Sequence, residues 1–316
     1  MFCADQCFFA EAFSVATFGR PLIKSFTGRK SGSFEERKMT ASGLVFVGIA
    51  PHPPIMVPEV GREHVAQVEG SVAAMREFAR RIIANRAETV VIVSPHAPLQ
   101  PDAFVVYADQ QVQGDFAAFR APQAEVRALT DRALLRAVQE VAAERGYRIV
   151  PLRGYRLDHG TAVPLYFLQR NGWRGRVVAL GYTFLSNDDH MRFGECLRRA
   201  AEKVRRRVAL VASGDLSHRL KPDAPAGYHP QARLFDEEIT ASIRTCALER
   251  IPDMDPNLRR IAGECGYRSM LVSIGASRDL PRKCELLHYE APFGVGYMVA
   301  QICSLSSDDG EEHGEK

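Results

Sequence analysis

The chain has 316 residues, of which 46% are hydrophobic and 25% are charged, a composition ordinary for a globular protein with one large core. Its formal net charge is only +3, from 41 Lys and Arg against 38 Asp and Glu. This near balance gives no sign of a nucleic-acid-binding protein. No apolar run reaches the length of about eighteen residues that a membrane helix needs. We therefore expect neither a nucleic acid nor a membrane as a partner.

The two ends of the chain differ from its middle. Residues 1–38 lack a positively charged start followed by a clean apolar run, so they make a poor secretory signal. We expect them to be a disordered extension or a mis-assigned start, with translation beginning at Met39. The catalytic domain is then expected at residues 39–303. The acidic residues 304–316 are expected to form a disordered tail.

The cysteines are scattered, odd in number and without paired CxxC spacing. This pattern favours reduced thiols in a cytoplasmic protein over a disulfide framework, and it argues against a structural zinc finger. The seven cysteines are Cys3, Cys7, Cys196, Cys246, Cys265, Cys284 and Cys303.

Strand and helix patterns alternate between these ends. Short apolar runs predict strands over residues 44–49, 89–93, 147–151, 176–182, 208–212, 284–289 and 294–302. Amphipathic stretches predict helices over residues 62–84, 123–145, 161–169, 188–206, 231–246 and 257–275. A looser segment before residue 123 is expected to add strands. Alternation of this kind predicts a single α/β domain, with a mainly parallel mixed sheet and helices on both faces.

Three of the predicted strands end in a histidine. GLVFVGIAPHPP leads to His52, ETVVIVSPHAP leads to His96, and RRVALVASGDLSH leads to His218. Prolines restrict the backbone around the first two, so these imidazoles stand on stiff turns. Because ligands bind at the carboxyl ends of strands in open parallel sheets, we expect the three imidazoles to meet in one crevice.

A metal site at this crevice needs a third ligand, and neighbouring residues Glu264 and Cys265 offer two choices. Neutral imidazole suits Fe(II), Zn and Cu alike. A carboxylate with two histidines would form the facial triad of non-haem Fe(II) oxygenases, whereas a thiolate favours zinc or copper. The helix predicted here separates adjacent residues by about 100°. Only one of the two should then face the metal, and the sequence leaves open which.

Further polar residues are candidates for catalysis and substrate binding. His218 is the candidate acid–base group, with Asp215 close enough in sequence to orient it. His159 precedes a predicted helix, whose first N–H groups would help to hold an anionic oxygen. Tyr228 and His229 are expected at the mouth of the same crevice. The histidines expected on the surface are His64, His190 and His313.

Five motifs together carry a family resemblance. PHPP, SPHAP, DHGTAVPL, GDLSH and ECGYRS occur in this order over residues 44–302. They resemble the class III extradiol ring-cleavage dioxygenases, and most closely proteins similar to the catalytic subunit of protocatechuate 4,5-dioxygenase. The resemblance implies that His52, His96 and Glu264 bind Fe(II), and that His218 is the acid–base residue. It further implies that His159 contacts substrate or oxygen, and that a catechol-like molecule and O2 are the reactants in aromatic catabolism.

The same fold also houses the Memo-like proteins, whose third ligand is a cysteine in a Cys-Gly context. Cys265 and Gly266 match that context, and Asp215 matches the Asp-x-x-His pattern of that branch. A Memo-like metal protein without ring-cleaving activity is therefore the alternative to a dioxygenase. A zinc-dependent hydrolase that uses a metal-bound hydroxide is a third and weaker reading. Whether the chain forms a homo-oligomer is left open.

Overall fold

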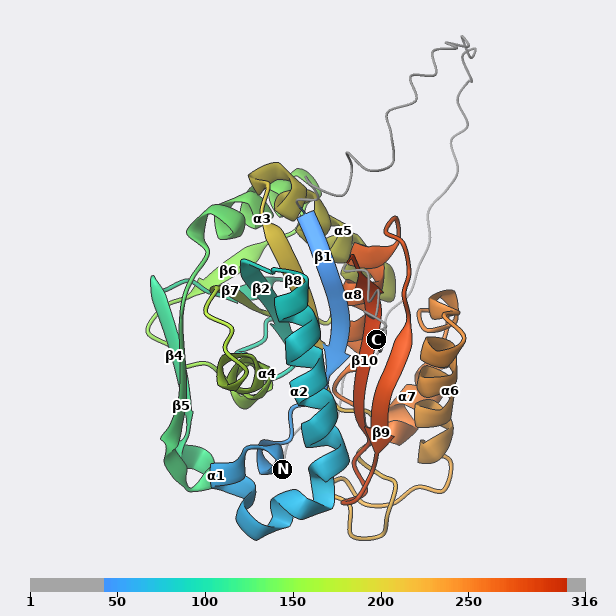
Figure 1. The fold of residues 1–316 in the computed structure, drawn as a ribbon. Coiled ribbons are helices and arrows are strands. Elements are labelled where there is room, and N and C mark those ends of the chain that lie inside the picture. The colour runs from blue at the N-terminus through green and yellow to red at the C-terminus, as the bar shows by residue number, and fades with distance from the viewer. Residues whose placement is uncertain (1–42, 306–316) are drawn as a thin grey trace, which may run out of the picture. The chain divides into compact units, whose positions relative to one another are not determined.

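A computed structural model describes residues 43–305 of the chain, and these belong to one compact unit (Figure 1). The expectations for residues 1–38, Met39, His313 and the end of the acidic tail lie outside the described residues. No helix among the described residues is long and apolar enough to cross a membrane.

The strands form one large sheet and one hairpin. The large sheet contains β1 (Gly43–Ala50), β2 (Thr89–Ser94), β3 (Phe104–Tyr107), β6 (Ile149–Leu152), β7 (Arg176–Gly181), β8 (Arg207–Ser213), β9 (Glu285–Glu290) and β10 (Tyr297–Ser304). Their order across the sheet is β6-β3-β7-β2-β8-β1-β10-β9. The hairpin pairs β4 (Gln111–Phe116) with β5 (Ala121–Leu129).

Strand direction changes three times across the large sheet. The central strands β7, β2, β8 and β1 are parallel to one another. On one side β10 and β9 run antiparallel to their neighbours. On the other side β3 runs antiparallel to β7, while β6 is parallel to β3. The sheet is therefore mixed, with the predicted parallel arrangement at its centre.

The helices cover both faces of the sheet, as predicted. The α-helices are α1 (Pro58–Gly61), α2 (Glu69–Ala84), α3 (Arg132–Glu144), α4 (His159–Arg170), α5 (Asn187–Val204), α6 (Ala232–Arg244), α7 (Pro256–Ala262) and α8 (Tyr267–Ser277). The short 3-10 helices are η1 (Pro54–Met56), η2 (Arg62–Val68), η3 (Ala117–Phe119) and η4 (Leu248–Arg250). In Figure 1, α2 and α4 lie on one side of the sheet, and α5 and α8 on the other.

Side chains that alternate in direction along the buried strands form two hydrophobic cores, one on each face of the sheet. Val47 and Ile49 of β1 pack into the core beneath α3, α5 and α8, whereas Phe46 and Ala50 of the same strand pack beneath α2 and α4. Successive side chains of a strand point to opposite faces. A strand that is buried on both faces therefore needs apolar residues at successive positions, which explains the continuous apolar run in the sequence.

Two of the predicted helices were wrong in extent. Residues 123–145 do not form one helix, because their first part is β5 and the helix begins only at Arg132. In β5 the exposed and buried residues alternate, which is the period of a strand and not of a helix. Residues 257–275 form two helices, α7 and α8, because α7 ends at Gly263 in the left-handed conformation, with φ of 65°.

The expectation that all cysteines are reduced is also corrected. Cys246, after α6, and Cys284, before β9, form a disulfide, with Cα atoms 5.4 Å apart. The two residues are far apart in sequence, so their spacing gives no sign of this pair. The disulfide ties the end of α6 to the edge strand of the large sheet. Among the described residues Cys196, Cys265 and Cys303 are free.

Candidate metal centre

Strand order brings the strand-end histidines to one edge of the sheet. β8 lies between β1 and β2 and is parallel to both, with Ala50 opposite Ser213 and Val93 opposite Ala212. The three strands therefore end at nearly the same level. His52 and His96 follow β1 and β2 closely, and their Nε2 atoms lie 3.0 Å apart.

Cys265 completes this group. Its Sγ lies 3.6 Å from His52 Nε2 and 3.9 Å from His218 Nε2. Two sets of side chains offer ligand atoms that lie within 4.8 Å of one another. One set is His52, His96 and Cys265, and the other is Asp215, His218 and Cys265.

Glu264 is not part of either set. Its carboxylate forms an ion pair with Arg259 at 3.3 Å and accepts the N–H of Tyr267 at 2.7 Å. It thus caps the start of α8 and compensates a guanidinium. The choice between Glu264 and Cys265 does not depend on helical phase, since both lie in the loop between α7 and α8.

Close backbone packing fixes the position of this loop. A Cβ atom on Gly214 would lie 2.1 Å from the Cα of Gly266, so only glycine allows the end of β8 and the loop to touch. The N–H of Gly266 donates to the carbonyl of Asp215 at 3.0 Å, and the N–H of Asp215 donates to Cys265 Sγ at 3.3 Å. The sulfur therefore stands at a place that the backbone determines.

A buried hydroxyl fixes the tautomer of His52. Ser213 Oγ donates to the carbonyl of Gly160 at 2.5 Å, and His52 Nδ1 lies 2.9 Å from Ser213 Oγ. Because the only proton of the hydroxyl is used, Nδ1 of His52 must be the donor in this pair. Its Nε2 is then the nitrogen with the free lone pair, and it faces His96 and Cys265.

A second network supports the turn that carries His96. The N–H of His96 donates to Ser94 Oγ at 3.2 Å, and that hydroxyl donates to Asp158 Oδ1 at 2.5 Å. Asp158 also accepts from the Tyr107 hydroxyl at 2.9 Å and caps α4 by accepting the N–H of Thr161 at 3.0 Å. One carboxylate therefore ties the His96 turn to the start of the helix that begins with His159.

His159 lies against the two strand-end histidines. Its ring stacks on His96 with centroids 4.2 Å apart and meets His52 edge-on at 5.3 Å. Burial lowers the pKa of His159, and burial together with the neighbouring histidines lowers the pKa of His52 and of His96. All three imidazoles are thus favoured in the neutral form that metals bind. His52 is buried, whereas His96 opens to solvent.

Burial raises the pKa of Asp215 and of Cys265, whereas it lowers the pKa of the three histidines. Burial raises the pKa of Asp215 to about 6, although His218 opposes this shift. Burial, and then the charge of Asp215, raise the pKa of the Cys265 thiol well above its usual value. A cation beside these groups would favour both ionised forms, since a coordinated thiol loses its proton.

The distances fit a small cation with nitrogen and sulfur ligands. At the tetrahedral angle, two imidazole nitrogens about 2.05 Å from one ion would be about 3.3 Å apart, and a nitrogen and a sulfur at about 2.05 and 2.3 Å would be about 3.5 Å apart. The observed separations are 3.0 Å for His52 and His96 and 3.6 Å for His52 and Cys265, each within a few tenths of an ångström of these values.

The remaining predicted site residues lie further from this group. The loop of Tyr228 and His229 is anchored to the His218 region, because the N–H of His229 donates to the carbonyl of Arg219 at 3.1 Å. The Tyr228 side chain is 55% exposed, and no described contact joins it to His52, His96 or Cys265. A role for both in substrate binding stays a prediction.

One surface prediction was wrong. His190 is fully buried, with Nδ1 2.7 Å from the carbonyl of Ser186 and Nε2 3.1 Å from that of Thr183. His64, by contrast, has an exposed side chain. A histidine near the start of a helix can therefore be buried when its ring nitrogens bond to backbone carbonyls just before that helix.

Several supporting residues were missed by the sequence reasoning. Ser94 and Asp158 stand within two residues of His96 and His159 in SPH and LDHG, whereas Ser213 stands five residues before His218 in SGDLSH. A hydroxyl or carboxylate within two residues of a motif histidine is the signal that would have found Ser94 and Asp158. Asp236 has no such signal: from α6 it accepts the N–H of Ser217 at 2.9 Å and the hydroxyl of Tyr289 at 2.8 Å. Burial raises its pKa to about 7.

The fold and this group define an α/β protein with candidate metal ligands at the carboxyl ends of central parallel strands. Comparison with protein families gives the same assignment, because residues 47–300 match the catalytic LigB subunit of aromatic ring-opening dioxygenase. The chain belongs to this family, and the resemblance seen in its motifs is confirmed.

Individual relatives are more distant. The chain is 34% identical over 269 residues to protein CA_C1420 of Clostridium acetobutylicum, covering 82% of this chain but 58% of that protein. It is 24% identical over 190 residues to a 3,4-dihydroxyphenylacetate 2,3-dioxygenase of Escherichia coli, covering 57% of this chain and 67% of that enzyme. The chain thus spans little more than half the length of the first of these relatives.

A solved structure supports the fold. The crystal structure of uncharacterized protein JW3007 from Escherichia coli K12 superposes with a TM-score of 0.56 at 16% identity. It covers 82% of this chain and 99% of its own length. At this identity the likeness extends to the fold alone.

Proposed function

We propose that this chain is a metal protein of the Memo-like type, with His52, His96 and Cys265 as its ligands. The observation that carries the proposal is the position of the Cys265 sulfur, 3.6 Å from His52 Nε2. Glu264, which an Fe(II) facial triad would require, is instead bound to Arg259. The change from a carboxylate to a thiolate replaces a hard ligand by a soft one, which favours zinc or copper over iron.

The protein residues around the ion have defined tasks in this proposal. Ser213 holds His52 in the tautomer that offers Nε2, and the Asp158 network holds the His96 turn. A bound ion would supply Lewis acidity or, if redox-active, an electron. His218, whose Nε2 lies 3.9 Å from Cys265 Sγ, would exchange a proton with a ligand bound to the ion.

The second candidate is an Fe(II)-dependent extradiol dioxygenase that opens a catechol ring with O2. It is supported by membership of the ring-opening dioxygenase family and by the clustering of His159 and His218 around the two strand-end histidines. In this reaction His218 would remove the proton of a substrate hydroxyl, and His159 would hold a polar oxygen. A cytoplasmic location and a catechol substrate belong to this second proposal.

Metal analysis of matched variants tests the ligand set. Protein purified without oxygen should hold about one equivalent of metal, and Cys265→Ser should lose most of it while Glu264→Gln retains it. Circular dichroism would check that both variants are folded, since Glu264 also pairs with Arg259 and its loss lowers stability. Loss of metal in the Glu264 variant alone would contradict the proposal and restore the facial triad.

Oxygen uptake separates the two candidates. The protein is loaded with Fe(II) without oxygen, mixed with a panel of catechols and then exposed to O2. A Memo-like protein should consume no oxygen above the rate of free Fe(II). Ring opening would instead give a yellow product. In that case His218→Ala should keep its iron and lose about 10² to 10⁴-fold in kcat, because that is the usual contribution of a general acid–base group.

A further inference from the structure

A cavity of about 380 Å³ lies at the opposite edge of the sheet from the metal centre. Strands β3 and β6 are parallel to each other but antiparallel to β7. Their carboxyl ends therefore point away from the edge at which β1, β2 and β8 end. Residues just after both strands form one wall of the cavity, and α3 forms the other. Carboxyl ends of parallel strands are the usual place for ligands in such sheets.

The charge in this cavity is of one sign. Three arginines line it, Arg132 and Arg136 from α3 and Arg153 from the end of β6, and no carboxylate lines it. None of the three guanidinium groups has an ion pair or a side-chain hydrogen bond within residues 43–305. The chain as a whole is almost neutral, with 41 basic and 38 acidic residues. An unbalanced cluster of three is therefore a local feature and does not follow from composition.

The nearest carboxylates have other partners. Asp109 accepts the N–H of Gly154 at 2.8 Å, and Glu140 forms an ion pair with Lys203 at 2.8 Å. The charge of Arg136 contributes only the last and smallest part of the lowering of the Glu140 pKa, behind Lys203. Glu140 is therefore compensated by Lys203, and Asp109 lies between the lining residues Ala108 and Gln110 without being one of the lining residues itself.

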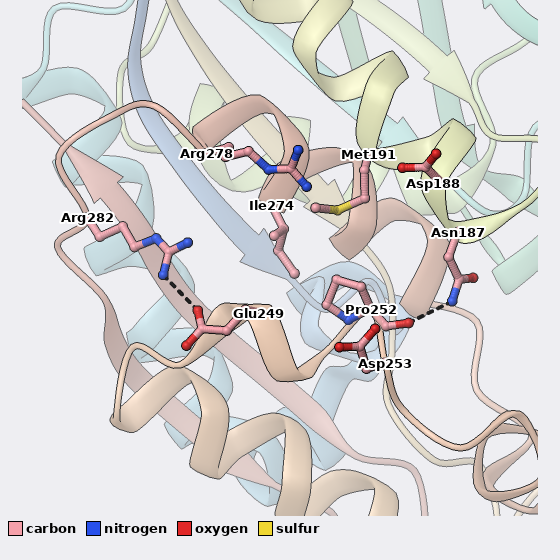
Figure 2. A pocket seen from close by; sticks show the side chains of 9 residues that line it. All are labelled: Asn187, Asp188, Met191, Glu249, Pro252, Asp253, Ile274, Arg278 and Arg282. Carbon is pink, nitrogen blue, oxygen red and sulfur yellow. Dashed lines mark hydrogen bonds and ion pairs between the residues drawn. The ribbon is translucent and has the colours of Figure 1, made fainter. Parts of the chain in front are cut away.

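At a second cavity of the same protein, two arginines form ion pairs with carboxylates. Figure 2 shows Arg278 and Arg282 at a cavity of about 350 Å³ beside α5 and α8. There Arg282 pairs with Glu249 at 3.0 Å, and Arg278 pairs with Glu195 at 3.3 Å. At this second cavity both arginines are therefore balanced by carboxylates.

We propose that the cavity of Arg132, Arg136 and Arg153 binds the phosphate group of a small soluble compound. Three planar guanidinium groups offer more donors than a carboxylate can accept, whereas a tetrahedral phosphate dianion can accept from all three. Gln110 and Gln139 line the same cavity and provide amide groups for the rest of the molecule. The volume is in the range of about 300 to 1,000 Å³ that small-molecule sites occupy.

Calorimetric titration with pyrophosphate tests the proposal on the full chain. In about 150 mM salt, pyrophosphate should bind saturably at one site with Kd below about 1 mM, and acetate at equal ionic strength should not. Arg136→Gln and Arg153→Gln should each weaken binding about tenfold or more, since each removes a charge-assisted hydrogen bond. Arg199→Gln is the matched control, because Arg199 is an exposed arginine of α5 outside the cavity.

The position of binding and the source of the phosphate need separate measurements. Backbone amide signals of α3 should shift on addition of pyrophosphate, and those of the Cys265 loop should not. Co-sedimentation with vesicles that contain phosphatidic acid should leave the protein in solution. No saturation, an equal loss in the Arg199 variant, shifts confined to the metal centre, or preference for the vesicles would each overturn the proposal.

Discussion

The hydroxyl of Ser213 should control metal affinity without touching the metal. In Ser213→Ala, His52 Nδ1 loses an acceptor at 2.9 Å, and the Gly160 carbonyl loses a donor at 2.5 Å. The imidazole is then free to take the other tautomer, whose Nε2 carries a proton and cannot bind a cation. Outer groups of this kind typically contribute 10- to 100-fold to metal affinity, which corresponds to about 1.4–2.7 kcal/mol.

A competition titration would measure this effect. Zn²⁺ is suitable because it has no redox chemistry, and a chromophoric chelator would report the free ion. Ser273→Ala is the matched control: this buried hydroxyl donates to the carbonyl of Met270 at 2.7 Å, within α8, and has no described bond to a histidine. We expect both variants to lose some thermal stability and only Ser213→Ala to lose Zn²⁺ affinity. Equal affinity in wild type and Ser213→Ala, or equal losses in both variants, would refute the tautomer argument.

Three further results are expected. Since burial raises the pKa of Asp236 to about 7, the folded protein binds this proton more tightly than the unfolded chain. The contribution of this carboxyl to the free energy of unfolding should therefore fall as pH rises from about 4 to 7. In urea titrations, the stability of the wild type relative to Asp236→Asn should decrease over that range, and a constant difference would contradict the raised pKa. Gly214→Ala should lower the melting temperature and release metal, because its Cβ would lie 2.1 Å from Gly266 Cα; unchanged metal content would contradict the packing argument. Reduction of the Cys246–Cys284 disulfide, whose ends are separated by 38 positions in sequence, should cost up to about 4 kcal/mol of stability in urea titrations with and without dithiothreitol; identical curves would show that the bond is absent in solution.

The sequence predicted the fold where one physical signal dominated. The runs before His52, His96 and His218 are apolar throughout, as strands buried on both faces must be, and the structure confirms all three strands. The prediction failed in residues 123–145, where the small and apolar residues of β5 lead directly into α3 and the boundary was lost.

The site was predictable in the same uneven way. Strand-end positions predicted that His52, His96 and His218 would meet. The structure brings His52 to His96 and places His218 Nε2 3.9 Å from the neighbouring Cys265 Sγ. The positions of Glu264 and Cys265 relative to the histidines were not predictable, because they depend on an ion pair with Arg259 and on a backbone contact across the fold. Such contacts leave no local pattern in a single sequence.

The contact between Gly214 and Gly266 has a consequence for how this protein family could change its chemistry. Because two backbones touch there, the Cα of residue 265 is held in place independently of its own side chain. A histidine, aspartate or serine introduced at 265 would present a different donor atom from the same point, beside His52 and His96. Under the proposed ligand set, a substitution at position 265 alone would change the hardness of the third ligand without moving the loop. Cys265→Asp would offer a carboxylate at this point while Glu264 continues to cap α8.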